Sequence, residues 1–336
     1  MSDDKTPKAA NIFDVARLAG VSHQTVSRVL NGLPNVRPAT KERVEQAIAQ
    51  LRYSPSPAAR ALVTRRTRTI GLITPGISDH GPVSIAMHFN LAARLARYSV
   101  DTVSQVDSDP ETVRTAVEGL LRQRVDAIVA VVTDFGVLEL VRGLDITIPL
   151  VASASTARRS PRVVSIDQYR GARAAVRHLA ELGHTRIHHL TGPNAATDSA
   201  ERIRGWRDEL SAHRLEAPDP IAGNWTAESG YRVGLTLDLE PGAAVFASND
   251  LSALGLLSAL RERGLRVPED VSVVGFDDVP EAAFFYPPLT TVRQDFAALG
   301  RQLMQKVLLA LEEGDMETMD TPLPTELIVR ASTTQR

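Results

Sequence analysis

The chain has 336 residues, of which 43% are hydrophobic and 23% charged, and it contains no cysteine. The length suits a small module plus a two-lobed one, and the composition is that of an ordinary globular protein. The lack of cysteine excludes disulfides and cysteine-ligated zinc or iron–sulfur sites.

The charge is divided between a basic N-terminal segment and an acidic remainder. Residues 1–66 carry a net charge of +6, so the other 270 residues carry −8. This distribution is the expected footprint of a protein that contacts phosphate groups with one end only. A solvated basic face is the alternative, and charge alone does not decide between the two.

The first ten residues, MSDDKTPKAA, lack the basic-then-apolar order of a secretory signal. No apolar run in the sequence is long enough to span a bilayer. We therefore expect a cytoplasmic protein without membrane contact.

Three helices are predicted in the basic segment. Asn11 is a suitable N-cap for the first helix, which Gly20 ends in a tight turn. Ser22 is the next N-cap, for a helix over residues 23–30, and a third helix is predicted over 38–51. Two helices that cross at so short a turn are typical of a helix-turn-helix.

Polar residues at the start of the second helix are suited to reading DNA bases. His23, Gln24 and Arg28 lie on the face away from the apolar stripe. Gln can bond adenine bidentately, and Arg can do the same with guanine. A solvated polar helix face is the alternative. Hydroxyl and amide side chains suited to phosphate are Ser22, Thr25, Ser27, Asn31 and Thr40.

The stretch DVARLAGVSHQTVSRVLNG, with the following VRPATKERVEQAIAQLRYSPSPAARAL, resembles the DNA-binding end of the lac repressor family. The resemblance implies that His23 and Gln24 are the specificity pair and that residues 57–63 form a hinge, helical only on operator DNA. It also implies DNA contacts for Ala59 and Leu62, of which Leu62 wedges into a central base step. Without the resemblance, this segment reads as a linker of weak helix propensity.

Beyond residue 68, apolar runs alternate with helical stretches. We predict strands buried on both faces of parallel sheets at 69–74, 100–106, 127–132, 150–152, 163–166, 187–190, 244–247 and 271–275. Predicted helices include 92–98, 113–122, 172–182 and 253–262. Two consecutive doubly wound α/β units imply two lobes with a ligand cleft beyond the carboxyl ends of the strands.

Polar residues follow several of these strands and are candidates for the cleft. Asn249 and Asp250 follow one strand, and Asp277 and Asp278 follow another. With Arg202, Trp225 and the segment 294–296, they offer carboxylate, amide and guanidinium groups beside an aromatic face, which suits a sugar. Each residue alone has a structural alternative, such as a core position for Trp225 or a helix cap for Asp277.

The resemblance extends over nearly the whole chain and implies a two-lobed core like that of periplasmic binding proteins. Four stretches resemble the protein after which the family is named more closely than they resemble a generic member. They are HLAELGHTRIHHLTGP, GNWTAESGY, ASNDLSALG and GLRVPEDVSVVGFDDVPEAAFFYPPLTTVRQDFAALG. The effector contacts that it implies are Asp79, Ile85, Arg202, Trp225, Asn249, Asp277, Gln294 and Phe296. The first lobe departs from this resemblance at three positions. The resemblance implies an apolar residue at Asp79, an amide at Val131 and an acidic residue at Ala154.

We divide the chain into a helix-turn-helix domain over 1–56, a hinge over 57–67 and a sensing core over 68–336. The first lobe of the core comprises about 68–166 and 296–323, and the second about 167–295 and 324–336.

The sequence does not favour catalysis. It contains no GxxxxGK[ST], HExxH or GxSxG motif. Asp277 and Asp278 are adjacent, so their side chains should point apart, and His188 and His189 should have one ring facing in and one facing out, in a structural role. No metal, cofactor or enzymatic activity is expected.

We therefore predict a homodimeric repressor that binds a pseudo-palindromic operator and is released by a sugar or glycoside. Two alternatives remain: the same architecture sensing a purine or another metabolite, and a sugar-binding transport receptor. A receptor should start with a secretory signal and lack residues 11–52. The dimer follows from the absence of apolar heptads after the strand predicted at 326–330.

Overall fold

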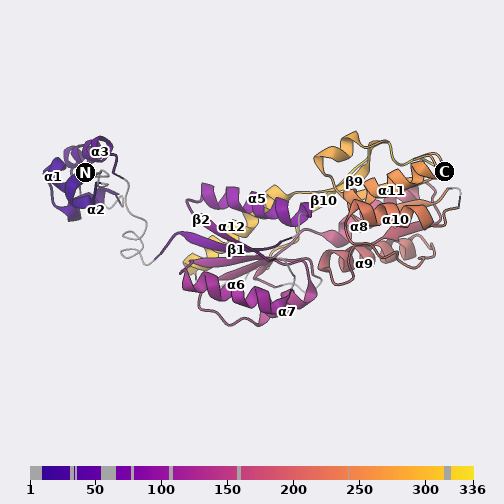
Figure 1. The fold of residues 1–336 in the computed structure, drawn as a ribbon, viewed down its shortest axis with the longest axis horizontal. Helices are drawn as coiled ribbons and strands as arrows, with labels where there is room; N and C mark the ends of the chain where they lie inside the picture. The colour runs from indigo at the N-terminus through magenta and orange to yellow at the C-terminus, as the bar shows by residue number, and fades with distance from the viewer. Residues whose placement is uncertain are drawn as a thin grey trace, which may run out of the picture. The chain divides into compact units, whose positions relative to one another are not determined.

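The structure is a computed structural model that describes residues 10–30, 34, 36–53, 66–76, 79–105, 109–156, 160–240, 242–313 and 319–336. The chain forms two compact units, Met1–Thr67 and Arg68–Arg336, each with its own hydrophobic core (Figure 1). The DNA contacts predicted for Asn31, Ala59 and Leu62, and the hinge helix, lie outside the described residues. No helix in the described part of the chain is long and apolar enough to cross a membrane.

The first unit contains the three predicted helices, α1 (Ile12–Ala19), α2 (His23–Leu30) and α3 (Pro38–Leu51). The Asn11 side chain accepts hydrogen bonds from the backbone N–H groups of Phe13 and Asp14, which confirms the predicted N-cap. Gly20 has φ 64°, a left-handed conformation that glycine adopts without strain. Apolar residues from all three helices form the small core, and Val15, Val26 and Val44 in it have no exposed surface.

The first lobe of the second unit is a parallel sheet of strand order β2-β1-β3-β4-β5. Its strands are β1 (Thr69–Pro75), β2 (Ser99–Gln105), β3 (Ala127–Val131), β4 (Leu150–Ser153) and β5 (Val163–Val164). Helices α5 (His80–Leu95) and α12 (Phe296–Glu313) cover one face, and α6 (Pro110–Arg122) and α7 (Phe135–Gly143) cover the other.

The second lobe is a sheet of order β10-β9-β8-β7-β6, in which β10 runs antiparallel to β9. Its strands are β6 (Ile187–Leu190), β7 (Ala244–Ala247), β8 (Ser272–Asp277), β9 (Thr290–Gln294) and β10 (Thr325–Ile328). Helices α8 (Gln168–Glu181) and α9 (Thr197–Ala212) pack on one face. Helices α10 (Ala227–Thr236) and α11 (Asp250–Glu262) lie on the other, where a short 3-10 helix (Pro280–Phe284) joins β8 to β9.

Three expectations about these elements are wrong. Strand β2 is not buried on both faces, because it is the edge of its sheet and the side chains of residues 99–104 are exposed or half-buried. The helix predicted over 92–98 is the end of α5, which begins at His80 and accommodates Pro82 in its first turn. The second sheet also contains the unpredicted strand β9 and is mixed rather than wholly parallel.

His188 and His189 lie on opposite faces of β6, yet both are buried, whereas the sequence predicted one exposed ring. Both faces of this edge strand are covered by helices, so neither ring reaches solvent. The His189 ring stacks on Phe246 at 4.5 Å between centroids, with Nδ1 2.9 Å from the Phe246 carbonyl oxygen. Burial lowers the pKa of His189 to about 3, so the ring is neutral and belongs to the core.

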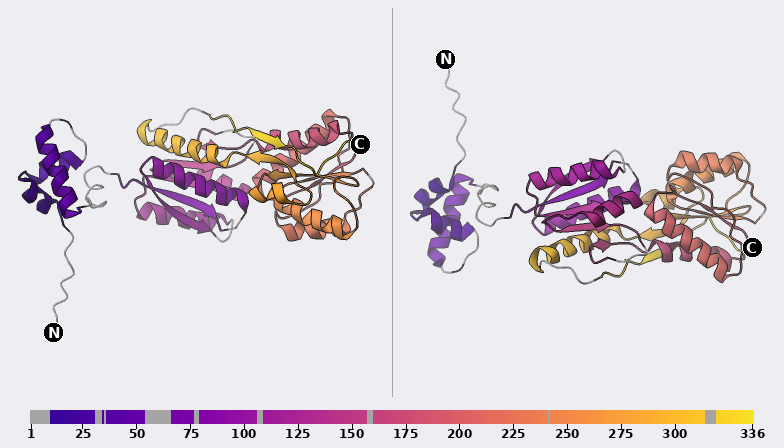
Figure 2. Two further views of the ribbon diagram at one scale, coloured as in Figure 1. Left: turned by 90° about the horizontal axis from the view of Figure 1, so that it is seen from above. Right: turned by 90° about the horizontal axis from the view of Figure 1, so that it is seen from below.

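The two lobes are joined where the chain passes from one sheet to the other. It passes from β5 to α8, from β9 to α12, and back along residues 319–325 to β10. Helix α12 therefore follows a second-lobe strand but packs beside α5 in the first lobe, where Figure 2 shows it in yellow next to the purple helix. A bridge between Ile166 and Leu323 ties two of these passages together.

Candidate functional site

A cavity of about 480 Å³ lies between the two lobes, at the carboxyl ends of strands from both sheets. This is the position expected for a ligand in open α/β sheets. All the residues predicted to contact an effector line the cavity: Asp79, Ile85, Arg202, Trp225, Asn249, Asp277, Gln294 and Phe296.

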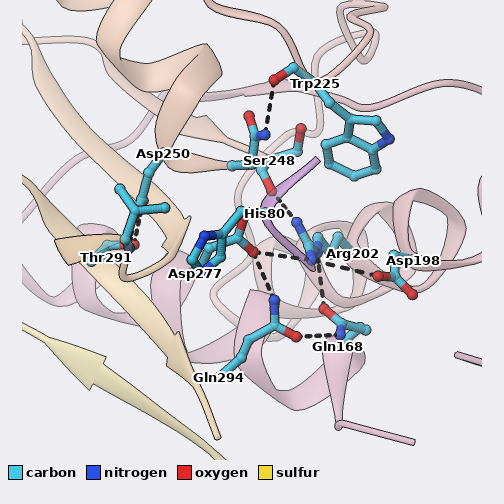
Figure 3. Close-up of polar contacts among 12 residues, drawn as sticks. His80, Gln168, Asp198, Arg202, Trp225, Ser248, Asp250, Asp277, Thr291 and Gln294 are labelled. Carbon is cyan, nitrogen blue, oxygen red and sulfur yellow. Dashed lines mark hydrogen bonds and ion pairs between the residues drawn. The ribbon is translucent and has the colours of Figure 1, made fainter. Parts of the chain in front are cut away.

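Arg202 is the central cation of the second-lobe wall. It projects from α9 with 3% of its surface exposed. Its Nε donates to Gln168 Oε1 at 3.0 Å, and Nη1 donates to the Ser248 carbonyl oxygen. Its Nη2 lies 3.7 Å from Asp277 Oδ1 and 3.8 Å from Asp198 Oδ2 (Figure 3). A buried guanidinium needs this many partners because losing water around a charge is costly.

Asp277 is held at the end of β8 by a buried amide chain. Gln294 Nε2 donates to Asp277 Oδ1 at 2.7 Å, and Gln168 Nε2 donates to Gln294 Oε1 at 2.7 Å (Figure 3). Burial raises the pKa of Asp277 to about 6, against the opposing effect of Arg202. Asp277 does not cap the following helix, whose N-cap is Val279.

Trp225 supplies an aromatic surface at the same wall. The Arg202 guanidinium carbon lies 5.1 Å from its ring, and Asn249 Nδ2 donates to its backbone carbonyl at 2.9 Å. The ring also crosses closely over Gly192, where an added Cβ would lie 2.2 Å from the indole. Only glycine fits at residue 192 with the indole in this place.

The first-lobe wall is chemically different. Ile85, Val131, Ala154 and Phe296 are all buried and apolar. This wall also has polar members, namely Asp79, His80, Thr133, Asp134, Ser153, Ser155 and Ser165. Asp79 lines the cavity at the start of α5 and does not cap that helix. The cavity therefore has a polar second-lobe wall and a first-lobe wall that mixes apolar and polar side chains.

The lobes also touch directly at the rim of the cavity. The Phe135 N–H donates to the Ala195 carbonyl at 3.3 Å, and the Thr197 N–H donates to the Thr133 carbonyl at 3.0 Å. These two bonds form an antiparallel bridge between Asp134 and Ala196. The structure therefore has a clasp between the lobes that any opening of the cleft must break.

Sequence reasoning missed several polar residues of the cavity, among them Gln168, Asp198 and His80. They lie in the first turns of α8, α9 and α5, and not directly after a strand. A helix that begins at the carboxyl edge of a sheet points its first turn at the same cleft, so this signal could have identified them.

Asp250 and Asp278 follow strands but do not line the cavity. Asp278 is paired with Arg293 at 2.7 Å and with Arg330 at 2.6 Å, so it points away from Asp277 as predicted. Asp250 accepts from Thr291 Oγ1 at 2.5 Å and from the Val279 N–H at 2.8 Å. Both carboxylates hold the second lobe together. Among the described residues, no group of His, Asp or Glu side chains is arranged to hold a metal ion.

The first unit presents a second candidate surface on α2. Ser22, His23, Gln24 and Arg28 are exposed, and Thr25, Ser27 and Thr40 are half-exposed. Arg28 Nη2 donates to the Pro34 carbonyl at 2.9 Å, which holds the guanidinium beside the loop after α2. Phe13 was not predicted for this surface, but it is 59% exposed and its ring centre lies 5.2 Å from that of His23.

Comparison with known families assigns both units. Residues 11–56 match the family model described as "Bacterial regulatory proteins, lacI family". Residues 176–333 match the model of a periplasmic binding protein-like domain.

Individual relatives match along the whole chain. The lactose operon repressor of Escherichia coli (strain K12) is 34% identical over 331 residues, which cover 97% of this chain and 91% of the relative. The transcriptional regulator CelR of Thermobifida fusca is 34% identical over 95% of this chain and 96% of its own length. The repressor PurR of Haemophilus influenzae (strain ATCC 51907 / DSM 11121 / KW20 / Rd) is 34% identical over 96% of this chain and 98% of its own length.

Solved structures agree with these relatives. A lac repressor dimer bound to operator and the anti-inducer ONPF superposes with a TM-score of 0.87 at 32% identity, covering 97% of this chain and 100% of that one. A CelR–cellobiose complex superposes with a TM-score of 0.70 at 29% identity, covering 96% and 99%.

The two carboxylates at Arg202 provide a test of the buried network. Asp277 and Asp198 lie at nearly equal distances from the guanidinium, but the Asp277 side chain is 8% exposed and the Asp198 side chain 36%. Chemical denaturation at pH 8 should show that Asp277→Asn lowers the free energy of unfolding by about 3 kcal/mol. Asp198→Asn should cost less than about 1 kcal/mol. Equal losses would mean that burial does not determine the strength of these pairs.

Proposed function

The chain belongs to the lacI family of bacterial regulatory proteins, and from this premise we propose that a sugar or glycoside bound in the cavity releases it from its operator. It is a DNA-binding transcriptional regulator with a helix-turn-helix unit and a two-lobed sensing core. The observation that carries the effector class is the second-lobe wall, where Trp225 stands beside the hydrogen-bonding network of Arg202, Asp277 and Asn249.

The proposed contacts with DNA follow from the exposed first turns of α2. In a helix-turn-helix the N-terminal part of the second helix enters the major groove. His23 and Gln24 occupy that part, and Arg28 lies one turn further along. We assign base reading to these three residues and phosphate contacts to the neighbouring hydroxyl side chains.

The proposed effector contacts use the two chemical halves of the cavity. Fork-like groups on the second lobe suit vicinal hydroxyls, and the indole of Trp225 suits the C–H face of a sugar ring. The CelR structure that resembles this chain is described as a cellobiose complex, which supports a saccharide ligand here. A purine or another flat metabolite is the alternative, and the Trp225 face alone would suit it as well.

Release from DNA requires that the effector favour one arrangement of the lobes. The ligand would contact second-lobe residues and α12, which starts at Phe296 in the cavity and packs beside α5. A change in lobe arrangement would thus alter the position of α5. We propose that this motion is transmitted to the DNA-binding units through the dimer.

The outer face of α5 is suited to the dimer contact. Val83, Met87, Leu91 and Leu95 follow one another at intervals of four residues and are 52%, 60%, 53% and 76% exposed. Residues spaced by four lie on one side of a helix, so they form a continuous apolar stripe. A second copy would bury it, and the dimer named in the similar lac repressor structure supports this assignment.

A regulator of transcription works where the chromosome is, and on that ground we propose a cytoplasmic location. The named relatives are regulators of transcription rather than enzymes. We propose that this chain likewise binds its effector without converting it.

Base and phosphate contacts can be separated by two substitutions in the first unit. Arg28→Ala should weaken binding to the preferred sequence by about 1–3 kcal/mol and relax selectivity at one base pair. Lys41 is an exposed cation in the first turn of α3, which we propose as a further phosphate contact. Lys41→Ala should therefore weaken all sequences alike and flatten the salt dependence. Fluorescence anisotropy on operator and random duplexes measures both. Equal losses for Arg28→Ala on the two duplexes would contradict a role in base reading.

Tryptophan fluorescence can identify the effector class. The chain has two tryptophans, of which Trp206 is fully buried in the core and Trp225 lines the cavity. A bound sugar should change the emission of the wild type and leave that of Trp225→Phe nearly unchanged. Panels of glycosides and of purines should be titrated in parallel. A response to purines with none to glycosides would replace the proposed effector class by the alternative.

Substitutions on α5 test the dimer. Leu91→Glu places a charge in the middle of the apolar stripe and should yield monomers in sedimentation velocity, because burying an unpaired charge is costly. The matched control is Phe135→Glu, since Phe135 is 44% exposed on α7, which covers the opposite face of the sheet. Dimers that survive Leu91→Glu would place the interface elsewhere.

A further inference from the structure

We propose that the effector carries a protonated amine on the part that faces the first lobe, where Asp79 binds it, so that the cavity takes an amino sugar or amine-bearing glycoside and rejects anionic ones. This inference rests on the proposed sugar effector and names its chemical class more closely. It depends on the surroundings of Asp79 and on the charge balance of the cavity.

Asp79 occupies a helix N-cap without acting as one. An aspartate at this position ordinarily accepts a hydrogen bond from an N–H in the first turn, which offsets its loss of water. The Asp79 carboxylate accepts none from α5, although the residue has an extended backbone with φ −64° and ψ 140°. The side chain lines the cavity instead.

No partner in the described part of the chain satisfies this carboxylate. Partial burial raises the pKa of Asp79, and no neighbouring group offsets that effect. The same first-lobe wall includes the buried apolar side chains of Ile85 and Val131. A ligand that brings a positive charge or a strong hydrogen-bond donor to Asp79 would therefore offset the free-energy cost of burying this carboxylate.

The other carboxylates of the cavity already have partners. Asp134 accepts from the backbone N–H groups of Gly136 and Val137 at the start of α7. Asp198 and Asp277 both lie beside Arg202. Asp79 is thus the carboxylate that remains available to a ligand among the described cavity residues.

The balance of charge favours a cation over a neutral donor. Asp79, Asp134, Asp198 and Asp277 line the cavity, and the Lys or Arg among its described lining residues is Arg202 alone. A phosphate or carboxylate on the ligand would add to this excess of negative charge. An ammonium group would reduce it and form a charge-assisted hydrogen bond with Asp79.

Matched glycosides that differ only in the charge of the aglycone can test the proposal. The probes are the 2-aminoethyl, ethyl and carboxymethyl glycosides of glucose, galactose and mannose, titrated into the full chain by calorimetry at pH 7.5. For the sugar that binds, the aminoethyl form should bind about tenfold more tightly than the ethyl form, and the carboxymethyl form should bind most weakly.

Asp79→Asn keeps the shape of the side chain and removes its charge. It should bring the aminoethyl and ethyl forms to within about twofold of each other, while continued binding of the ethyl form shows an intact cleft. Glu118→Gln removes an exposed carboxylate on α6, outside the cavity, and should keep the wild-type preference.

Four outcomes would overturn the proposal. Equal affinity of the wild type for the aminoethyl and ethyl forms would contradict the proposed recognition of an amine, but it would leave the proposed sugar effector unaffected. If Asp79→Asn still prefers the aminoethyl form, a group other than Asp79 binds the amine. If the carboxymethyl form binds most tightly, the cavity prefers an anionic ligand. Binding of adenine or hypoxanthine with no binding of any glycoside would remove the sugar effector itself, and the amine with it.

Discussion

The buried guanidinium of Arg202 is the constraint on which the ligand cavity depends. A charge that has lost its water must be surrounded by partners, and those of Arg202 come from α8, α9, the end of β7 and the end of β8. These elements are far apart in the sequence, and their shared contacts with the Arg202 guanidinium hold them in place relative to one another. Two further hydrogen bonds link Gln168 to Gln294 and Gln294 to Asp277 at the cavity wall. The second lobe therefore offers a ligand a rigid polar surface.

The first lobe contributes a different kind of surface to the same cavity. Its apolar side chains can accept varied groups, while Asp79 adds a carboxylate at the start of α5. Since α5 also carries the exposed apolar stripe, the proposed effector contact and the proposed dimer contact lie on one helix. The backbone clasp between residues 133–135 and 195–197 joins the lobes at the rim. Any coupling between ligand and DNA has to act through these few connections between the lobes.

The sequence by itself determined most of the elements and the location of both candidate surfaces. Local signals sufficed for the first unit, where Asn11, Gly20 and Pro38 mark helix ends through backbone chemistry that needs no distant partner. Polar residues directly after buried strands sufficed for the second-lobe wall, since parallel strands end at one edge of their sheet. The edge position of β2 and the mixed second sheet were missed because strand order is decided by packing and not by local pattern.

Only the tertiary structure decided which polar groups face the cavity and which hold the lobe together. Asp277 and Asp278 are adjacent in the sequence, yet one meets Arg202 and the other meets Arg293 and Arg330. Gln168 lies at a helix start, where a polar residue reads as a cap, and its orientation follows from Gln294 and Arg202, which are distant in the chain. Burial and charge compensation act through space, so a linear pattern can name the candidates while the fold assigns their partners.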